Sequence, residues 1–196
     1  MMKVMRVLFG TAAALAMGGA TALVQAAAVP ATKTADQAFM QLADTYFDSY
    51  YFPTNPSLAT VDGIHAYDAR LENYSRAGVD ANVKALKQWE HRVAAVDPAT
   101  LGERVQGDRE LVLNNIRSTL LTLETIRPWQ KNPDIYSSGI TSSTFTLMSR
   151  KFASPETRLR ALIARERRMP AALVAARKNL DNPPKIYTQI ALEQLP

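Results

Sequence analysis

The sequence contains no cysteine and only two histidines, His65 and His91. The lack of cysteine excludes disulfide bonds, thiolate metal sites and a cysteine nucleophile. It also excludes an N-terminus anchored to a membrane through a lipid on cysteine. Two distant histidines cannot form a His-Glu-x-x-His zinc helix, so that motif is absent from these 196 residues.

Other catalytic motifs are missing as well. There is no phosphate-binding glycine-rich loop ending in Gly-Lys-Ser/Thr, and Gly-x-Ser-x-Gly does not occur around Gly139. Carboxylates such as Glu110 and Glu124 have no evident partner as acid and base. Sustained alternation of polar and apolar residues is also absent, which disfavours β-strands. The sequence therefore holds no complete catalytic constellation.

The N-terminus has the layout of a secretory signal peptide over residues 1–28. Lys3 and Arg6 precede an apolar run from Val7 to Val24, and small residues follow, with cleavage expected near residue 26 or 28. A membrane anchor is the alternative, but the run is only marginally long enough to span a bilayer. The pattern predicts a periplasmic or secreted protein, a tether over residues 29–33 and a helical domain over residues 34–196.

Charge and hydropathy limit the partners of the mature chain. The formal charge is +5, and removal of Lys3 and Arg6 leaves +3. This modest charge, together with export, argues against nucleic acid. No later apolar run approaches membrane-spanning length, so we expect no membrane association after signal cleavage.

The first helical pattern begins with a capping box at Thr34–Gln37 and is expected to stop at Pro53. Its apolar residues repeat at helical spacing. They could form core or line a substrate groove, and core is the more common outcome for such an aromatic stripe. The residues are Phe39, Leu42, Ala43, Tyr46, Phe47 and Tyr50.

Asn55-Pro56 predicts a short helix that ends near Gly63, followed by a loop from Gly63 to Leu71. Within this loop, His65 and Asp68 are the only close His–carboxylate pair. A catalytic role would need a nucleophile that the spacing does not supply. The alternative is that these polar groups fix the geometry of their own loop.

The next two helices flank a predicted connection over residues 97–107. Ser75 is expected to cap the first and Asp108 the second, which should end at Pro128. Trp129 would then fill one end of the bundle. The apolar stripe of the second helix comprises Leu113, Ile116, Leu120, Leu123 and Ile126, widened by Val112 and Leu121.

Further helices are predicted after Asn132-Pro133, Ser154-Pro155 and Pro170, and a last one begins near Ile186 and ends without a closing partner. Dense Ser and Thr residues between Ser137 and Thr146 weaken the helical signal there. In the helix after Ser154, Leu159, Leu162 and Ile163 are expected to face inward. The basic run should be a solvated face or grip an acidic partner; it comprises Arg158, Arg160, Arg165, Arg167 and Arg168.

Together these patterns predict an all-α fold: an irregular antiparallel helical bundle of about six or seven helices. Within this order of helices, four places resemble the N-terminal part of the bacterial domain of unknown function 885 (DUF885) family. They are Asp48–Tyr50 leading through Asn55–Thr60 to Gly63–Leu71, then Asp108–Leu111, then Arg127–Trp129 with Asn132, Pro133 and Tyr136, and finally the Arg158–Leu180 region closing on Asn182–Pro184.

The resemblance implies a longer, exported, mostly helical protein similar to zinc metallopeptidases, with its zinc motif in a C-terminal half that this sequence lacks. It places no cofactor or metal ligand on any residue here. The chain is then expected to be a truncated, catalytically incomplete domain that forms one wall of a substrate cleft. Its partners would be the missing C-terminal domain and a peptide substrate. The candidate cleft-facing residues are His65, Tyr67, Asp68, Arg70 and Trp129.

The alternative hypothesis is a stand-alone periplasmic module that binds an unknown ligand or partner. It would use the aromatic stripe or the arginine run as its binding surface.

Overall fold

The computed structural model describes residues 31–193, and every regular element within them is helical. Seven of these helices have nine or more residues, which confirms the all-α prediction. The predicted signal peptide lies outside the described residues. No helix within residues 31–193 has the length and apolar character needed to cross a membrane. The α-helices are α1 (Ala31–Tyr46), α2 (Phe52–Thr54), α3 (Pro56–Val61), α4 (Arg76–Ala94), α5 (Glu103–Leu121), α6 (Pro128–Lys131), α7 (Asp134–Ser149), α8 (Pro155–Glu166), α9 (Met169–Asn179) and α10 (Lys185–Glu193).

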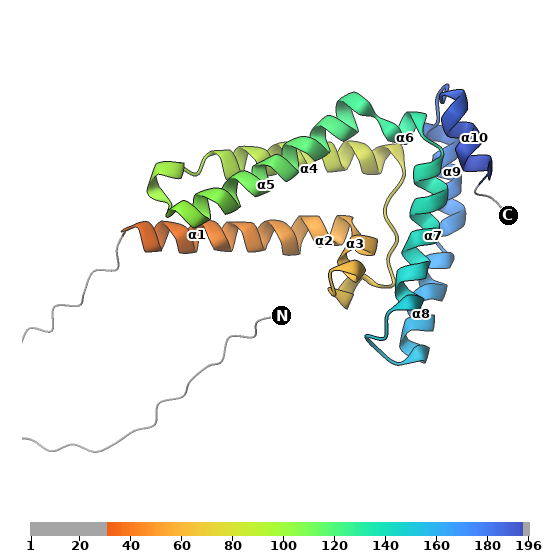
Figure 1. Cartoon of the computed structure of the whole chain (residues 1–196), viewed down its shortest axis with the longest axis horizontal. Coiled ribbons are helices and arrows are strands. Elements are labelled where there is room, and N and C mark those ends of the chain that lie inside the picture. Colours follow the sequence, from red (N-terminus) through yellow and green to blue (C-terminus); the bar gives the residue numbers. More distant parts are fainter. Residues whose placement is uncertain (1–30, 194–196) are drawn as a thin grey trace, which may run out of the picture.

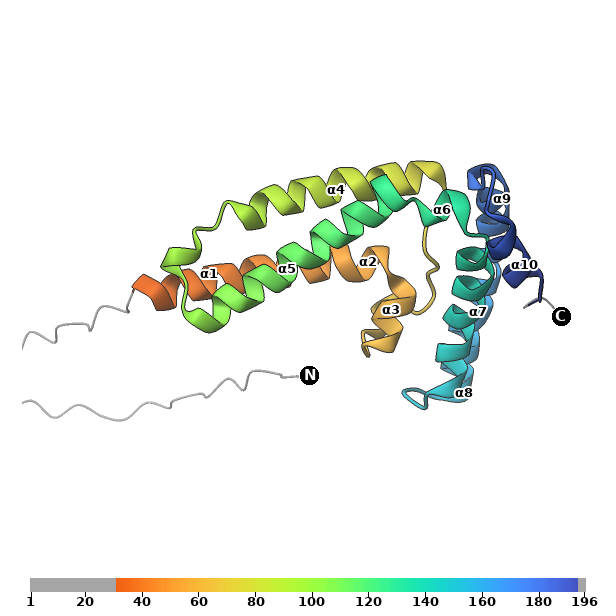
Figure 2. The same ribbon diagram turned by 45° about the horizontal axis from the view of Figure 1, so that its top comes forward.

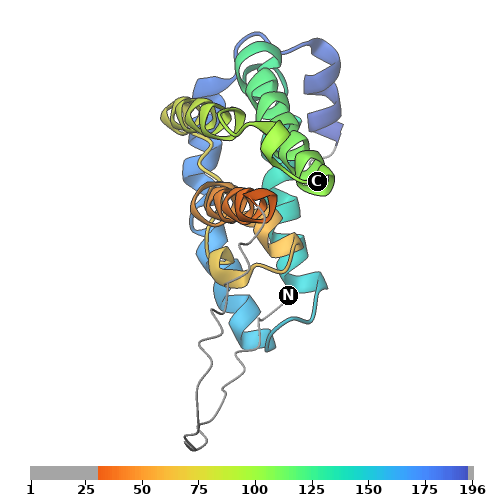
Figure 3. The same cartoon turned by 90° about the vertical axis from the view of Figure 1, so that its left-hand side faces the viewer.

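The helices form two groups that meet at α6. Helices α1, α4 and α5 lie lengthwise beside one another, α2 continues the line of α1, and these four helices make up the first group (Figure 1). Helices α3, α7, α8, α9 and α10 make up the second group, in which α7, α8 and α9 run across one end of the first (Figure 2). Figure 3 shows this most directly, because α1, α4 and α5 are seen nearly end-on there.

The first group has a continuous apolar core. Its buried members include the aromatic residues predicted from α1, which confirms that the stripe is core rather than a groove. Leu121 and Ile126 are exceptions to the predicted α5 stripe, since they are 53% and 52% exposed. The buried residues are Phe39, Ala43, Tyr46, Tyr50, Leu86, Trp89, Val93, Leu101, Val112, Leu113, Ile116 and Leu120.

Two predicted boundaries around α1 are wrong. The helix already includes residues 31–33, so Thr34 does not cap it. At the other end Pro53 does not stop the helical path, because a π-helical turn over Phe47–Tyr51 leads directly into α2. Pro53 has no N–H to donate, and the Tyr67 hydroxyl donates instead to the carbonyl of Asp48 at 3.3 Å. The wider turn thus accommodates a proline that would otherwise end the helix.

The predicted start of the central helix is also wrong. Helix α5 begins at Glu103 after Gly102, so Asp108 lies inside the helix and does not cap it. The connection is shorter than expected because Asp97 caps a 3₁₀ turn over Pro98–Thr100, where its side chain accepts from the Ala99 N–H at 2.9 Å. Asp36 of α1 then accepts the N–H of Gly102, which fixes the entry to α5.

Other local predictions are confirmed. Ser75 caps α4 by accepting from the Gly78 N–H, and Ser154 caps α8 by accepting from the Thr157 N–H. Helix α7 forms despite its many hydroxyl side chains. These side chains donate to carbonyls three or four residues earlier and so do not compete with the helix for its N–H groups. After a second π turn, Arg127 adopts a left-handed conformation (φ 52°, ψ 52°) immediately before Pro128, where the helix was expected to end.

The second group contradicts the predicted inward face of α8. Leu159 and Ile163 are 47% and 39% exposed, whereas Arg158 and Arg165 are buried. Arg158 donates to the carbonyls of Met148 and Arg150, which closes the C-terminal end of α7. The basic run is therefore only partly a solvated face. Arg158 in particular carries donors to backbone oxygens at the end of α7, which the helix leaves without partners.

Candidate functional site: the His65 pocket

The candidate site begins where α3 ends. Gly63 follows this helix with a positive φ of 83°, a conformation that glycine adopts without a steric cost. The chain then forms a 3₁₀ turn over His65–Tyr67 and brings Asp68 back beneath the helix. As predicted, the segment is a turn, and His65 and Asp68 are paired within it. Their Nδ1 and Oδ2 atoms lie 3.1 Å apart.

A chain of buried hydrogen bonds fixes Asp68 from behind. Its Oδ1 atom accepts from the Thr60 hydroxyl at 2.6 Å. The oxygen of Thr60 accepts in turn from Nη2 of Arg165 at 2.6 Å. Arg165 also donates to the carbonyl of Ser143 in α7. Three helices, α3, α7 and α8, therefore hold the carboxylate in one position.

Burial lowers the pKa of Arg165, while the negative charges of Glu72 and Asp68 act in the opposite direction. Arg165 is fully buried, and its Nε atom has no hydrogen-bond partner. The guanidinium reaches Asp68 through the hydroxyl of Thr60. Glu72 is already engaged at the start of α3, where it accepts from the N–H and hydroxyl of Ser57.

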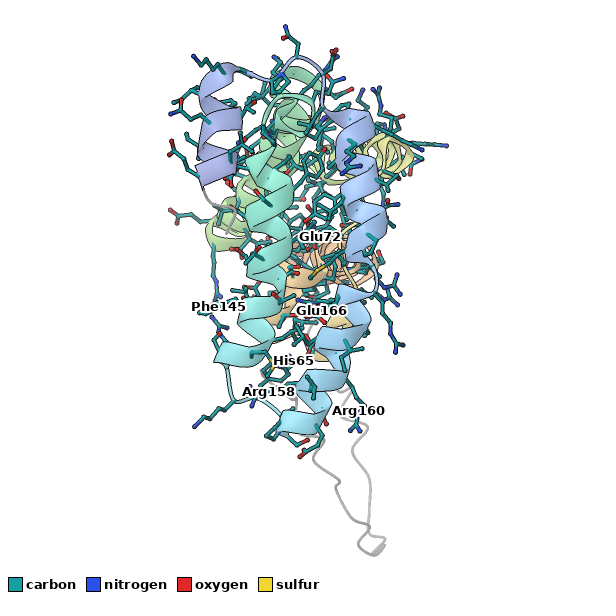
Figure 4. All side chains as sticks on the ribbon, turned by 90° about the vertical axis from the view of Figure 1, so that its right-hand side faces the viewer. His65, Glu72, Phe145, Arg158, Arg160 and Glu166 are labelled. Carbon is teal, nitrogen blue, oxygen red and sulfur yellow. The ribbon has the colours of Figure 1, made fainter. Side chains whose placement is uncertain are left out.

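The other side of His65 is covered by an aromatic ring from a different part of the chain. Phe152, in the loop between α7 and α8, stacks on the imidazole with a centroid separation of 3.7 Å and an interplanar angle of 8°. The His65 side chain remains 35% exposed. Figure 4 shows His65 between α7 and α8, near the loop that joins them.

His65 opens onto a surface pocket of about 410 Å³. The pocket lies between the turn after α3, the Phe152 loop and one face of α8. This volume is within the range of pockets that hold small molecules or single side chains. Its lining includes His65, Asp68, Phe152, Thr157 and Arg160.

The pocket holds a paired carboxylate and imidazole, and the hydroxyl in its lining is that of Thr157. Asp68 orients the imidazole in the way that a carboxylate orients a catalytic histidine. Within residues 31–193, however, no serine or threonine hydroxyl is hydrogen-bonded to His65, and the hydroxyl of Thr157 pairs with Ser154. The interpretation that His65 and Asp68 fix the geometry of their own loop is therefore supported, since Asp68 accepts a hydrogen bond from Thr60 and is paired with His65 in the same turn.

The remaining candidate residues lie apart from this pocket. The Tyr67 hydroxyl bonds to the α1 end, and the guanidinium of Arg70 lies 5.1 Å from the Tyr67 ring centroid. Trp129 is buried in a second apolar cluster with Val79, Tyr136 and Ala176, where its indole N–H donates to the Leu123 carbonyl. It fills the junction at α6, as expected. This junction and α8 are at opposite ends of α7 (Figure 1).

The described residues do not fit the zinc that the family resemblance implies. In the part of the chain from 31 to 193, no three His, Asp or Glu side chains come together in a way that could hold a metal ion. His65 has one carboxylate neighbour, Asp68, whose two oxygens are already hydrogen-bonded. Structural and catalytic zinc sites need three or four such ligands.

Sequence reasoning identified His65 and Asp68 but missed Phe152, Arg160 and Arg165. The last two were assigned to a general basic run, and Phe152 was assigned to no element. A weak signal was present, because Arg158 and Arg165 are seven residues apart and so share one face of a helix. A charged pair at this spacing could have marked the inward side of α8.

Comparisons with known proteins agree with this architecture. A structure described as "a putative lipoprotein of unknown function from Shewanella oneidensis" is similar with a TM-score of 0.73 and 25% sequence identity. The match covers 80% of this chain and 28% of that one, so the chain spans less than a third of this relative's length. No curated protein matches. The family model of a bacterial protein of unknown function, DUF885, matches residues 56–196, and the chain therefore belongs to the DUF885 family.

Proposed function

We propose that this chain is the substrate-side helical region of an exported, metallopeptidase-like DUF885 protein. On this proposal it forms one wall of a cleft, and the zinc site and the opposite wall belong to a C-terminal part. The relative is long enough to contain such a part, since the match covers only 28% of it. The observation that carries the proposal is an uneven distribution of exposed apolar side chains between the two helix groups.

The first group buries its apolar residues well. Its exposed large hydrophobic residues are scattered: Met40, Leu111, Leu121 and Ile126. The second group exposes three times as many, on nearly every helix. Extensive exposed apolar surface marks interaction sites on soluble proteins. These residues are Leu58, Val61, Phe145, Met148, Leu159, Ile163, Leu173, Val174, Ile186, Tyr187, Ile190 and Leu192.

A groove of about 280 Å³ runs between α7, α9 and α10 within this region. It is lined largely by apolar atoms, including those of Leu173, Leu180 and Leu192. Helix α10 contributes one face to the groove, yet Ile186 and Ile190 of the same helix stay 56% and 38% exposed. A further helix of the same protein is the occupant that the proposal places on this surface, because the relative is far longer than the matched part.

Export is part of the proposal. The N-terminal 28 residues have the features of a signal peptide, and the similar Shewanella protein is described as a lipoprotein. Since this chain has no cysteine, it cannot carry the lipid in the same way. A periplasmic location, with the signal removed, fits both observations.

The alternative of a stand-alone binding module has less support. The aromatic stripe it would use lies in the core of the first group. Two of the five arginines it would use, Arg158 and Arg165, are buried and hydrogen-bonded inside the second group.

The proposal is tested by zinc titration and peptide hydrolysis with the full chain. We expect no stoichiometric zinc binding by calorimetry and no cleavage of a mixed fluorogenic peptide set. Tight zinc binding or turnover by this chain alone would show that the catalytic centre lies within it, and the proposal would be wrong.

A further inference from the structure

We infer that the His65 pocket is a carboxylate-binding subsite, formed by the imidazole of His65 and the guanidinium of Arg160. The inference rests on the proposed function, and it narrows the substrate class to peptides that present a free carboxylate, at the C-terminus or on an acidic side chain. The stacked pair of His65 and Phe152 would form one wall of the subsite.

The hydrogen bonds around His65 determine what the ring can offer to a ligand. Asp68 accepts from Thr60 through Oδ1, and Oδ2 is placed to accept from Nδ1–H of the imidazole. Nε2 is then left without a partner among the described residues. In the protonated ring this atom carries a second N–H donor.

Arg160 supplies the second positive charge. It lines the same pocket from α8, and its guanidinium has no hydrogen bond or ion pair within residues 31–193. The other exposed arginines of the run, Arg167 and Arg168, line a different depression beside α9. Arginine with imidazolium suits a carboxylate, because both give charge-assisted hydrogen bonds to oxygen.

The pocket contains no free negative charge to compete with such a ligand. Of the residues that line it, only His65, Asp68 and Arg160 are charged or titratable. Both oxygens of Asp68 are engaged on the side facing Thr60 and the imidazole. Phe152, Ala153 and Ala161 provide an apolar remainder that can contact a small side chain next to the carboxylate.

The chain has only two histidines, which makes a direct test possible. N-acetyl-alanine is titrated into the full chain at pH 6 while the imidazole Cε1–H signals are followed by NMR. We expect a saturable shift of the His65 signal and none of the His91 signal, which lies on α4 and serves as an internal control. N-acetyl-alaninamide, which lacks the carboxylate, should give no shift.

Arg160→Gln should weaken binding about tenfold, the size expected for loss of one charge-assisted bond. Arg104→Gln is the matched control, since Arg104 is an exposed arginine on α5 in the first group.

Equal shifts with the amide, parallel shifts of both histidines, or unchanged affinity in Arg160→Gln would each overturn the subsite. Those outcomes leave the proposed function standing, because they say nothing of zinc binding or turnover by this chain. Conversely, zinc binding or hydrolysis would overturn the proposed function whether or not acetyl-alanine binds.

Discussion

The two helix groups are stabilised by different kinds of interaction. In the first group, α1, α4 and α5 enclose an apolar core in which Phe39, Leu113 and Ile116 are almost completely buried. In the second group the buried positions include Arg158 and Arg165 as well as Ile140 and Leu147 of α7, while many of the other leucines and isoleucines are exposed. The first group is thus stabilised by its own apolar core, whereas buried polar side chains connect the helices of the second group and many of its apolar side chains stay exposed.

This difference changes what each region is expected to tolerate. Apolar cores lose stability through cavities, in proportion to the volume removed. Buried polar networks lose stability when one member is removed, because its partners are left without hydrogen bonds. Exposed apolar positions contribute little to folding, so their effect should appear in association instead.

The largest effect should come from the first core. Leu113→Ala is expected to lower the free energy of unfolding by about 3 kcal/mol, because a fully buried leucine leaves a cavity. Leu111→Ala, two positions away and 69% exposed, should change it by less than about 0.5 kcal/mol. Urea denaturation followed by circular dichroism measures both. Similar losses in the two variants would contradict the assigned faces of α5.

Alkaline pH should destabilise both groups, because each buries tyrosines. Burial raises the pKa of Tyr50 to about 12 and raises the pKa values of Tyr46 and Tyr74 further. An unfolded tyrosine ionises near its ordinary pKa of about 10. The buried neutral tyrosines therefore contribute their full stabilisation below pH 10. This contribution is lost as the pH rises toward the pKa of the folded state, by about 1.4 kcal/mol per pH unit for each tyrosine.

Tyr50→Phe should reduce the slope of stability against pH between about pH 10 and 12, since it removes one of these groups. Tyr187→Phe, at a position that is 41% exposed, is the control and should leave the slope nearly unchanged. Chemical denaturation at a series of pH values gives the slopes. A steeper loss in Tyr50→Phe than in the wild-type chain would be inconsistent with a buried neutral phenol.

Removal of the buried guanidinium of Arg165 in the second group should have the next largest effect on stability. Arg165→Met keeps much of the volume but leaves the Ser143 carbonyl and the Thr60 oxygen without their donor. We expect a loss of about 2 kcal/mol in the free energy of unfolding. Arg167→Met, at an exposed position directly after α8, should cost less than about 0.5 kcal/mol. Equal stability of the two variants would mean that the hydrogen bonds of the Arg165 guanidinium to α3 and α7 do not stabilise the fold.

The smallest effect on stability should come from the exposed apolar surface. Phe145→Ser, at a side chain that is 71% exposed, should change the free energy of unfolding by less than about 0.5 kcal/mol. The same variant should bind less of a hydrophobic dye such as ANS and should self-associate less in light scattering. A large loss of stability without these changes would place Phe145 in a core and remove it from the proposed contact surface.

Much of the fold could be predicted because local rules decide it. Ser75 and Ser154 cap helices through contacts three residues away, and Pro128 ends one by its own geometry. These signals lie within a few residues of each other in the sequence. The apolar spacing of α1 likewise identified Tyr46 and Tyr50 as core before any tertiary contact was known.

The rest depended on tertiary contacts that local rules do not contain. Arg165 is buried because it reaches Thr60, more than a hundred residues earlier, and no periodicity reports such a pairing. Asp108 has a side chain suited to cap a helix. The connection between α4 and α5 nevertheless ends earlier, because Asp97 accepts from the N–H of Ala99 and Asp36 accepts from the N–H of Gly102. For the same reason the pairing of His65 with Asp68 could be predicted from the sequence. The pocket could not, because Phe152 and Arg160 reach it from a distant part of the chain.

The arginines that close the two helical hairpins also bear on the order in which the chain folds. Arg109 bonds to carbonyls 13 and 15 residues earlier at the end of α4, and Arg158 to carbonyls 8 and 10 residues earlier at the end of α7. Such short loops close quickly, whereas the Arg165 contacts span 105 and 109 residues. Each hairpin can therefore form as a local unit, and the geometry around His65 is established only when α3 and the turn after it pack against the hairpin of α7 and α8.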